Sequence, residues 1–470
     1  MTELKVVTIA GSTITLSQAT IDGFRKQIRG AVVLPGEQGY DQLREVWNGQ
    51  IDRRPAMIAR VAGTDDIVAA VNFARDNQLL VSVRGGGHNM PGLAVCDGGL
   101  MIDCNGLQNV RVDPAKRRAY ADPGCTWFDF DHQTQSYGLA VPGGAVSHTG
   151  IAGLTLGGGV GWLSGKHGLT CDNVVSFQIV TPDGKLRTVN AQENADLYWG
   201  LRGGGGNFGI VTQFEYQLHP VGMMLAGMIL YPFPSAKAFF RGYGDFLPSC
   251  PDELTTFGGL FKLPDGTSVA GAIVAYNGDH AEGQKALEPF RKFTAPMADL
   301  VGPMRYVKVQ RLIDEQTDPH RRYYVRSNLF RTIPDQAIDV MIESYTNVPS
   351  PLSMLAFQQF GNAIGRVPKD STAYGHRGEK IEQMTFAAWT DPAHDEINKQ
   401  WARELSDQMK PFTHGHYVNQ VGLESEEGAD RIKAAYGDNW DRLVALKTKY
   451  DPMNLFRHNQ NIRPATPVGV

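Results

Sequence analysis

The chain has 470 residues, more than one ordinary domain holds, so we expect two packed domains. Hydrophobic residues make up 42% of the chain and charged residues 20%, which is typical of a globular protein. The net charge is −4 and no basic stripe is present, which argues against a nucleic-acid partner. No apolar run approaches the roughly 20 residues that a membrane-spanning helix requires, so no membrane partner is expected either.

Two features of the chain bear on its location in the cell. Residues 1–20 lack the pattern of a secretion signal, a basic segment followed by a continuous apolar block. The five cysteines are odd in number and form no Cys-x-x-Cys pair, which argues against a disulfide framework and against a cysteine-type zinc site. We therefore expect a protein of the reducing cytoplasm.

Glycine is unusually frequent and unevenly distributed. The chain has 53 glycines, and half of them lie within residues 81–210. Because glycine loses much backbone entropy on folding, such density indicates close approach of the backbone to another group. A ligand that carries phosphate is the natural candidate, since runs of small residues expose peptide N–H groups in concave arrays.

The first elements lead into a glycine loop. An apolar stripe at helical spacing predicts a helix over 64–77, and residues 79–83 are typical of a buried strand. The segment Arg84-Gly85-Gly86-Gly87-His88-Asn89 follows at once. A helix, a strand and a glycine loop therefore form one unit here.

Several elements are expected in the region that follows. They are strands at 100–103 and 118–121, helices at 127–137 and 193–199, and a strand at 208–218. A hairpin is expected over 174–180 and 185–189, because Thr181-Pro182-Asp183-Gly184 between them suits a type I turn.

Beyond residue 220 the composition of the sequence changes. Glycine is sparser, and strands at 223–230 and 267–276 mix with a helix at 335–344. This mixture predicts a second, α+β domain. Two helices, at 428–436 and 440–450, are expected near the end of the chain.

Known nucleotide and metal motifs fit poorly. Gly204–Gly209 spells the G-x-G-x-x-G of a Rossmann fold, but that motif opens a helix, whereas a strand pattern follows here. A Walker loop fails because His167 follows Gly165-Lys166. His414 and His416 could share one face of a strand, but no carboxylate or cysteine cluster joins them, so no metal site is expected.

What remains is a set of glycine loops at strand ends. They are Gly85–His88, Gly143-Gly144, Gly150–Gly161 and Gly203–Gly209. Together they favour a cradle of peptide groups around a pyrophosphate. The alternative, that the glycines serve only tight turns and close packing, stays open for any one loop.

These loops resemble those of a known family. Arg84-Gly85-Gly86-Gly87-His88-Asn89 resembles the covalent-flavin loop of the berberine-bridge-enzyme-like oxidases, within the vanillyl-alcohol-oxidase superfamily. Thr149–Gly159 and Trp199–Val211 resemble the second and third flavin loops of that family. Further matches, in the family's order, are Tyr40–Asn48, Arg54-Pro55-Ala56, His416-Tyr417-Val418-Asn419 and Tyr450–Phe456.

The resemblance implies an α+β fold with a PCMH-type FAD-binding domain. A second, substrate-binding domain should roof the flavin with an antiparallel sheet. The expected FAD-binding domain is 1–220, with its PCMH-type core at about 50–220. The substrate-binding domain is expected at 221–415, and a C-terminal segment, 416–470, should return to the FAD domain.

The resemblance also implies FAD as the cofactor, attached covalently through a ring nitrogen of His88. The alternative is a histidine that only hydrogen-bonds nearby backbone. Many relatives add a cysteine at the position of Val146, so a single histidyl link is expected here. The cofactor-binding residues carried over are Arg84, Gly85, Gly86, Gly87, His88, Asn89, Gly92, Gly143, Gly144, Val146, Thr149, Gly150, Gly153, Gly158, Gly159, Val211, Tyr417, Asn419 and Asn459.

For the reaction, the resemblance implies hydride transfer from a substrate carbon to flavin N5. Tyr417 is the candidate catalytic base for the substrate O–H or N–H proton. Because an ordinary tyrosine has a pKa of about 10, a packing or orienting role is the alternative. Asn419 is expected on the same side of an extended strand, where it would bond the flavin pyrimidine edge.

The expected function is oxidation of a CH–OH or CH–NH group of a small molecule, with O2 as second partner and H2O2 as product. Thr149 stands where the family has valine in oxidases and leucine in dehydrogenases, and threonine has the shape of valine. The alternatives are a flavin dehydrogenase with another acceptor, an NAD(P)-dependent Rossmann enzyme, and a flavin-fold protein that binds without turnover. Residues 357–360 are candidate wall residues of the substrate site, with alternate side chains pointing away.

Overall fold

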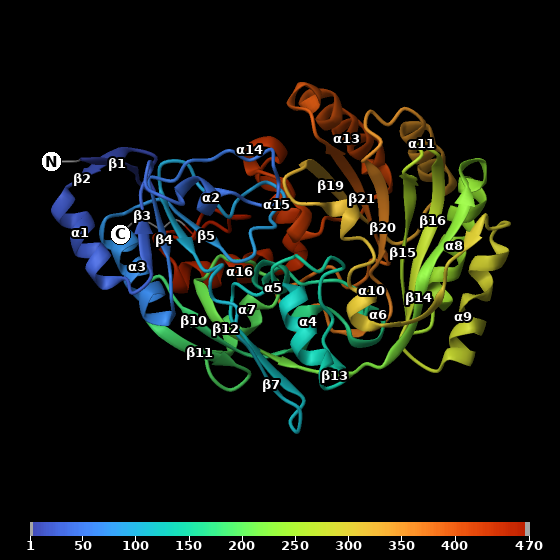
Figure 1. The fold of residues 1–470 in the computed structure, drawn as a ribbon, viewed down its shortest axis with the longest axis horizontal. Coiled ribbons are helices and arrows are strands. Elements are labelled where there is room, and N and C mark those ends of the chain that lie inside the picture. Colours follow the sequence, from blue (N-terminus) through green and yellow to red (C-terminus); the bar gives the residue numbers. More distant parts are fainter. Residues whose placement is uncertain (1–2, 466–470) are drawn as a thin grey trace.

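The computed structural model describes residues 3–465, and it has two α+β parts that lie side by side (Figure 1). The part at the left of Figure 1 contains a four-stranded and a five-stranded sheet built from residues before 220, and the part at the right contains one large sheet. All strand pairs of the large sheet are antiparallel. The expected α+β class is confirmed.

The first sheet delivers the predicted glycine loop. Its strands, in order, are β3 (Ala31–Val33), β4 (Met57–Arg60), β6 (Leu100–Asp103) and β5 (Val81–Arg84). Strands β4, β6 and β5 run parallel, so the loop that follows β5 starts at their common carboxyl edge. The remaining elements of this layer are the strands β1 (Leu4–Val7) and β2 (Thr13–Leu16) and the helices α1 (Gln18–Gln27), α2 (Tyr40–Arg44) and α3 (Thr64–Asp76).

The second sheet has five antiparallel strands. In order they are β11 (Leu186–Asn190), β10 (Val174–Val180), β12 (Ile210–Gln217), β8 (Arg118–Ala121) and β7 (Val110–Asp113). The predicted hairpin is confirmed: β10 pairs with β11, and the N–H of Gly184 donates to the carbonyl of Thr181 at 2.8 Å. Strand β12 begins directly after Gly209, so the run Gly204–Gly209 opens a strand and the Rossmann alternative is wrong.

Short elements lie between successive strands of the second sheet and between that sheet and the large sheet. They are α4 (Trp127–Gln135), β9 (Leu139–Ala140), α5 (Ile151–Leu156), α6 (Ser164–His167), α7 (Ala195–Leu201) and β13 (His219–Pro220). Helix α5 begins directly after Gly150, within the glycine loop Gly150–Gly161.

The large sheet forms the core of the second part. Its strands, in order, are β17 (Ala298–Asp299), β14 (Met223–Pro232), β16 (Ser268–Tyr276), β15 (Leu254–Lys262), β20 (Met354–Gln359), β21 (Ile381–Trp389) and β19 (Arg322–Phe330), with β18 (Gly302–Arg305) also paired to β14. The helices of this part are α8 (Ala236–Phe246), α9 (His280–Lys292), α10 (Tyr306–Val309), α11 (Asp335–Thr346), α12 (Ala363–Arg366) and α13 (Asp395–Met409).

Helices α8, α9, α11 and α13 cover the outer face of the large sheet (Figure 1). Their aromatic and aliphatic side chains bury that face; the ring of Phe240 on α8, for example, lies 4.9 Å from that of Phe357 on β20. The inner face is therefore left to face the first part.

The end of the chain returns to the first part through α14 (Glu424–Glu427), α15 (Ala429–Tyr436) and α16 (Trp440–Tyr450). The fully buried ammonium of Lys447 donates to the carbonyl of Asn207 at 2.8 Å and to Asp451 Oδ2 at 2.7 Å. The first of these bonds attaches α16 to the glycine loop Gly203–Gly209. The domain boundaries at 220 and 415 stay a prediction. Among residues 3–465, no helix has the combination of length and apolar character needed to cross a membrane.

Candidate active site

A cavity of about 970 Å³ lies between the glycine loops and the inner face of the large sheet. Small-molecule sites usually enclose about 300–1,000 Å³, so this one can hold a large ligand or two ligands together. The floor comes from the loops around residues 84–89, 144–154 and 205–211. The roof comes from strands β14, β15, β16, β20 and β21.

The glycines of the floor have two distinct reasons to be glycine. A Cβ on Gly86 would lie 2.5 Å from the Cα of Gly150, so these two loops touch backbone to backbone. A Cβ on Gly153 or Gly206, in contrast, would meet no protein atom within 4 Å and would point into open space of the cavity. Bare peptide groups that line open space fit a flat or phosphate-bearing cofactor that lies directly against the backbone.

Most of the predicted cofactor-binding residues line this cavity. They are Arg84, Gly85, Gly86, Gly87, His88, Asn89, Gly144, Val146, Thr149, Gly150, Gly153, Val211, Tyr417, Asn419 and Asn459. The other four, Gly92, Gly143, Gly158 and Gly159, are not part of the cavity wall. They lie behind it: a Cβ on Gly143 would lie 2.7 Å from the Trp127 ring, and the N–H of Gly159 donates to Tyr417 Oη at 2.8 Å.

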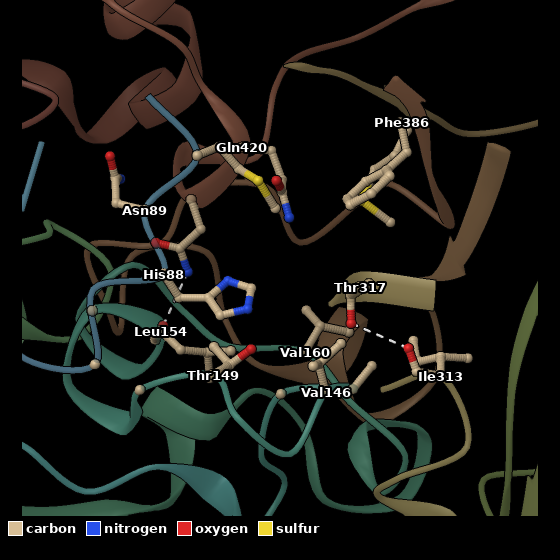
Figure 2. Close-up of a pocket in the computed structure, with 18 of the residues that line it drawn as sticks. His88, Asn89, Val146, Thr149, Leu154, Val160, Ile313, Thr317, Phe386 and Gln420 are labelled. Atoms are coloured by element: carbon tan, nitrogen blue, oxygen red, sulfur yellow. Dashed lines mark hydrogen bonds between the residues drawn. The ribbon is translucent and has the colours of Figure 1, made fainter. Parts of the chain in front are cut away.

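His88 projects from the first glycine loop into the cavity, as Figure 2 shows, with Thr149 below it and Phe386 on the opposite wall. The indole of Trp47 stacks on its imidazole at 4.1 Å between ring centroids. Its Nε2 lies 3.1 Å from Nδ1 of His148. Burial, and then the neighbouring His148, lower the pKa of His88 to about 3. The imidazole is therefore neutral at physiological pH and retains a nucleophilic nitrogen.

Tyr417 also lines the cavity, but its segment is not the extended strand that was expected. Residues Val418–Gln420 form a 3-10 turn, in which the N–H of Gln420 donates to the carbonyl of Tyr417 at 2.9 Å. Tyr417 Oη accepts from the N–H of Gly159 and from Nδ2 of Asn419, both at 2.8 Å. The expected closeness of Tyr417 and Asn419 thus arises from a turn. Burial raises the pKa of the Tyr417 phenol, so it stays protonated at neutral pH and needs a partner to act as a base.

Glu382 is the residue that the sequence did not reveal. It lies on β21 two and four residues from Met384 and Phe386, which line the cavity, so it belongs to the same face of the sheet. Its Oε1 accepts a hydrogen bond from Ser327 Oγ at 2.6 Å, while Oε2 has no partner. Burial raises the pKa of Glu382 to about 8, and its charge contributes to the raised pKa of Tyr417. Glu382 is fully buried and is not part of the cavity wall, so a carboxyl group lies behind the wall and close enough to the Tyr417 phenol to affect its pKa.

The roof is otherwise mainly apolar. Its side chains include Met228, Phe257, Ile273, Met354, Met384 and Phe386. Of the four predicted wall residues, only Gln358 lines the cavity. Phe357 packs in the outer core, Gln359 accepts from the N–H of Thr256 at 3.0 Å, and Phe360, beyond the end of β20, packs in a core cluster with Tyr417.

Comparisons with known proteins fit this geometry. Residues 55–190 match the FAD binding domain family, and residues 416–463 match the berberine and berberine-like family. An FAD-linked oxidoreductase of Dictyostelium discoideum is 32% identical over 450 residues, which are 94% of this chain and 97% of the relative. The chain belongs to the berberine-bridge-enzyme-like FAD-linked oxidoreductases.

Solved structures confirm the fold expected for this family, a PCMH-type FAD-binding domain with a sheet-roofed second part. The 6-hydroxy-D-nicotine oxidase of Arthrobacter nicotinovorans matches with a TM-score of 0.84 at 26% identity, over 93% of this chain and 98% of that one. BBE-like 1 of Physcomitrella patens has a TM-score of 0.86 at 22% identity, over 95% and 99%, which shows the shared fold. In sequence, (R)-6-hydroxynicotine oxidase of Paenarthrobacter nicotinovorans is 30% identical over 93% of this chain and 97% of the relative.

Val146 and Cys104 both line the cavity of this berberine-bridge-enzyme-like chain. The five cysteines are all free and buried, and Cys104 reaches the cavity wall. Burial raises the pKa of the Cys104 thiol, which disfavours the reactive thiolate.

Proposed function

We propose that this protein is an FAD-dependent oxidase that carries FAD through one covalent bond, to His88. The observation that carries the proposal is the neutral imidazole that projects from a glycine loop into a cavity floored by bare peptide groups. Val146 and the protonated thiol of Cys104 leave no cysteine suited to a second bond. The five free cysteines also support the cytoplasmic location expected from the sequence.

The chain's own residues divide the work of the proposed reaction. Bound FAD supplies the hydride acceptor, and the protein orients it. Tyr417 and Glu382 supply the proton acceptor for the substrate O–H or N–H group. Glu382 ionises near pH 8, whereas the Tyr417 phenol stays protonated, so Glu382 is the group that can accept the proton, and Tyr417, fixed by Asn419 and Gly159, orients the substrate.

The apolar roof bears on the substrate. Among the relatives are a hydroxynicotine oxidase and the chitooligosaccharide oxidase of Gibberella zeae. An oligosaccharide needs many hydrogen-bond partners, whereas Met228, Phe257, Met384 and Phe386 offer none. We therefore favour a CH–NH or CH–OH group on an aromatic or otherwise apolar ring. Anaerobic bleaching of the flavin by compounds of each class measures this preference, and it also tests the alternative of a protein that binds without turnover.

The covalent bond predicts a specific mass. Purified protein that is denatured and digested should give one peptide, containing His88, that carries the added mass of FAD. The same protein precipitated with acid should come down yellow. His88→Ala should release its flavin into the supernatant, because the bond has no other anchor. Colourless precipitate from the wild-type protein would contradict the proposed link.

Oxygen as electron acceptor predicts one H2O2 for each substrate oxidised. Thr149 lines the cavity at the position where the family's oxidases have valine. The larger side chain in Thr149→Leu should slow reoxidation of the reduced flavin by O2 by roughly tenfold, equivalent to about 1.4 kcal/mol. Stopped-flow measurement of both half-reactions separates this effect from substrate oxidation. If wild-type protein instead produces no peroxide and needs another acceptor, it is a dehydrogenase.

A further inference from the structure

His88 is held by a closed ring of contacts that includes a residue from the second part of the molecule. His148 lies 3.1 Å from it on one side, and Trp47 stacks against its ring. Nε2 of His148 lies 3.3 Å from Thr317 Oγ1, and the indole N–H of Trp47 donates to the carbonyl of Thr317 at 2.9 Å. Thr317 therefore ties together both neighbours of His88.

The ring of contacts favours one placement of the protons. The single hydroxyl proton of Thr317 has carbonyl acceptors in Ile313 and Asp314, at 3.1 and 3.2 Å, both closer than Nε2 of His148 at 3.3 Å, and the bond to Ile313 is drawn in Figure 2. We infer that the oxygen of Thr317 accepts from Nε2–H of His148. Neutral His148 keeps a lone pair on Nδ1, which accepts from Nε2–H of His88. His88 is thereby left with a bare lone pair on Nδ1.

We propose that His148 is a positioning residue for the covalent flavin bond. It holds His88 in the tautomer whose Nδ1 is nucleophilic, and it takes the Nε2 proton when that nitrogen forms the bond. This inference rests on the proposed covalent FAD. It adds a role for His148 and for Thr317 behind it.

The step balances without a further group. A bond forms between Nδ1 of His88 and the methyl carbon at flavin position 8, and one C–H bond of that methyl breaks. The proton from Nε2 passes to Nδ1 of His148, and the methyl proton ends on the flavin. The electron pair of the broken C–H bond leaves the flavin reduced by two electrons. Dioxygen, the acceptor of the proposed oxidase, then takes up these electrons as H2O2.

The test compares the flavin that is bound with the flavin that survives acid precipitation. His148→Phe keeps a ring but has no acceptor; it should bind FAD while its acid-resistant fraction falls at least tenfold below the wild-type fraction. His148→Asn places an amide oxygen near the position of Nδ1 and should restore most of the linked fraction. Thr317→Val removes the oxygen that accepts from Nε2–H of His148, so His148 is no longer held in one tautomer. Its acid-resistant flavin fraction should lie between those of wild type and His148→Phe. His132→Phe, at an exposed histidine outside the cavity wall, is the control and should equal wild type.

The position of the bond gives a second readout that a structural role would not move. NMR of the flavin peptide should show the 8α methylene close to the β-methylene of His88, as a bond at Nδ1 requires. Contact with the ring proton Hδ2 would place the bond at Nε2 and overturn the inference. Full acid-resistant flavin in His148→Phe or, should that variant not fold, in Thr317→Val would overturn it too. Wild-type protein that releases all its flavin would instead contradict the proposed link itself.

Discussion

Glu382→Gln is expected to lower kcat by about 100-fold or more, within the range of about 10²–10⁴ for loss of a general base. The substitution keeps the shape of the side chain and its bond to Ser327 Oγ, but it removes a buried carboxylate oxygen that has no partner and whose charge acts on Tyr417. Flavin content and the acid-resistant fraction should stay at wild-type values. Glu379→Gln, at a buried glutamate that is not among the groups that shift the pKa of Tyr417, is the matched control. Unchanged kcat in Glu382→Gln would show that Glu382 is not the proton acceptor.

The pH dependence follows from the pKa of Glu382, which burial raises to about 8. Only the ionised carboxylate accepts a proton, so wild-type kcat should rise with pH through about 8. In Glu382→Gln this rise should be absent. Stopped-flow flavin reduction between pH 6 and pH 10 measures both profiles.

The raised pKa of Glu382 affects stability in the opposite direction: kcat should rise with pH, whereas the free energy of unfolding should fall. The folded pKa lies above the usual value of 4.5, so the folded state binds this proton more tightly than the unfolded state. The stabilisation is fully present below about pH 4.5 and is lost as pH rises through about 8. Glu382→Gln should therefore unfold at a higher temperature than wild type at pH 8–9. A variant that loses activity while it gains stability cannot have lost activity by misfolding.

The sequence predicts the floor of the site better than its roof. The floor is built from glycine loops, each of which is a short continuous stretch of sequence. Their backbone N–H groups form the site, so a short glycine motif is enough to predict them. The roof is a sheet whose strand β21 is buried at all nine positions, so no alternation marks which side chains face the cavity. Glu382 is hidden for that reason.

Contacts across long sequence separations also escape prediction. Thr317 meets Trp47 and His148 across 270 and 169 residues, and no local pattern connects them. The extended strand expected around Tyr417 is wrong, because residues Val418–Gln420 form a 3-10 turn. The hydroxyl of Tyr417 accepts from the backbone N–H of Gly159, which is 258 residues away in the chain, and no local pattern shows that contact.

Gly153→Leu is expected to give a folded protein that does not hold flavin. Gly153 lies in the short helix α5, where leucine is a better helix former than glycine by about 0.6–1 kcal/mol, so the backbone is not weakened. Apart from its chain neighbours and the backbone of α5, no protein atom lies within 4 Å of the added Cβ, and Gly153 lines the cavity, so we expect the leucine side chain to extend into the cavity. If FAD lies against this backbone, leucine occupies its place.

The size of the effect follows from packing. Overfilling a closely packed site costs typically about 1–3 kcal/mol, which weakens binding roughly ten- to hundredfold. Gly23→Leu is the matched control, because Gly23 is also helical, also has no neighbour within 4 Å of an added Cβ, and lies in α1, outside the cavity wall. The ratio of visible flavin absorbance to protein absorbance, with the unfolding temperature, measures both variants. A yellow Gly153→Leu protein with normal flavin content would mean that the cofactor does not lie on α5, and the open glycines of the floor would need another explanation.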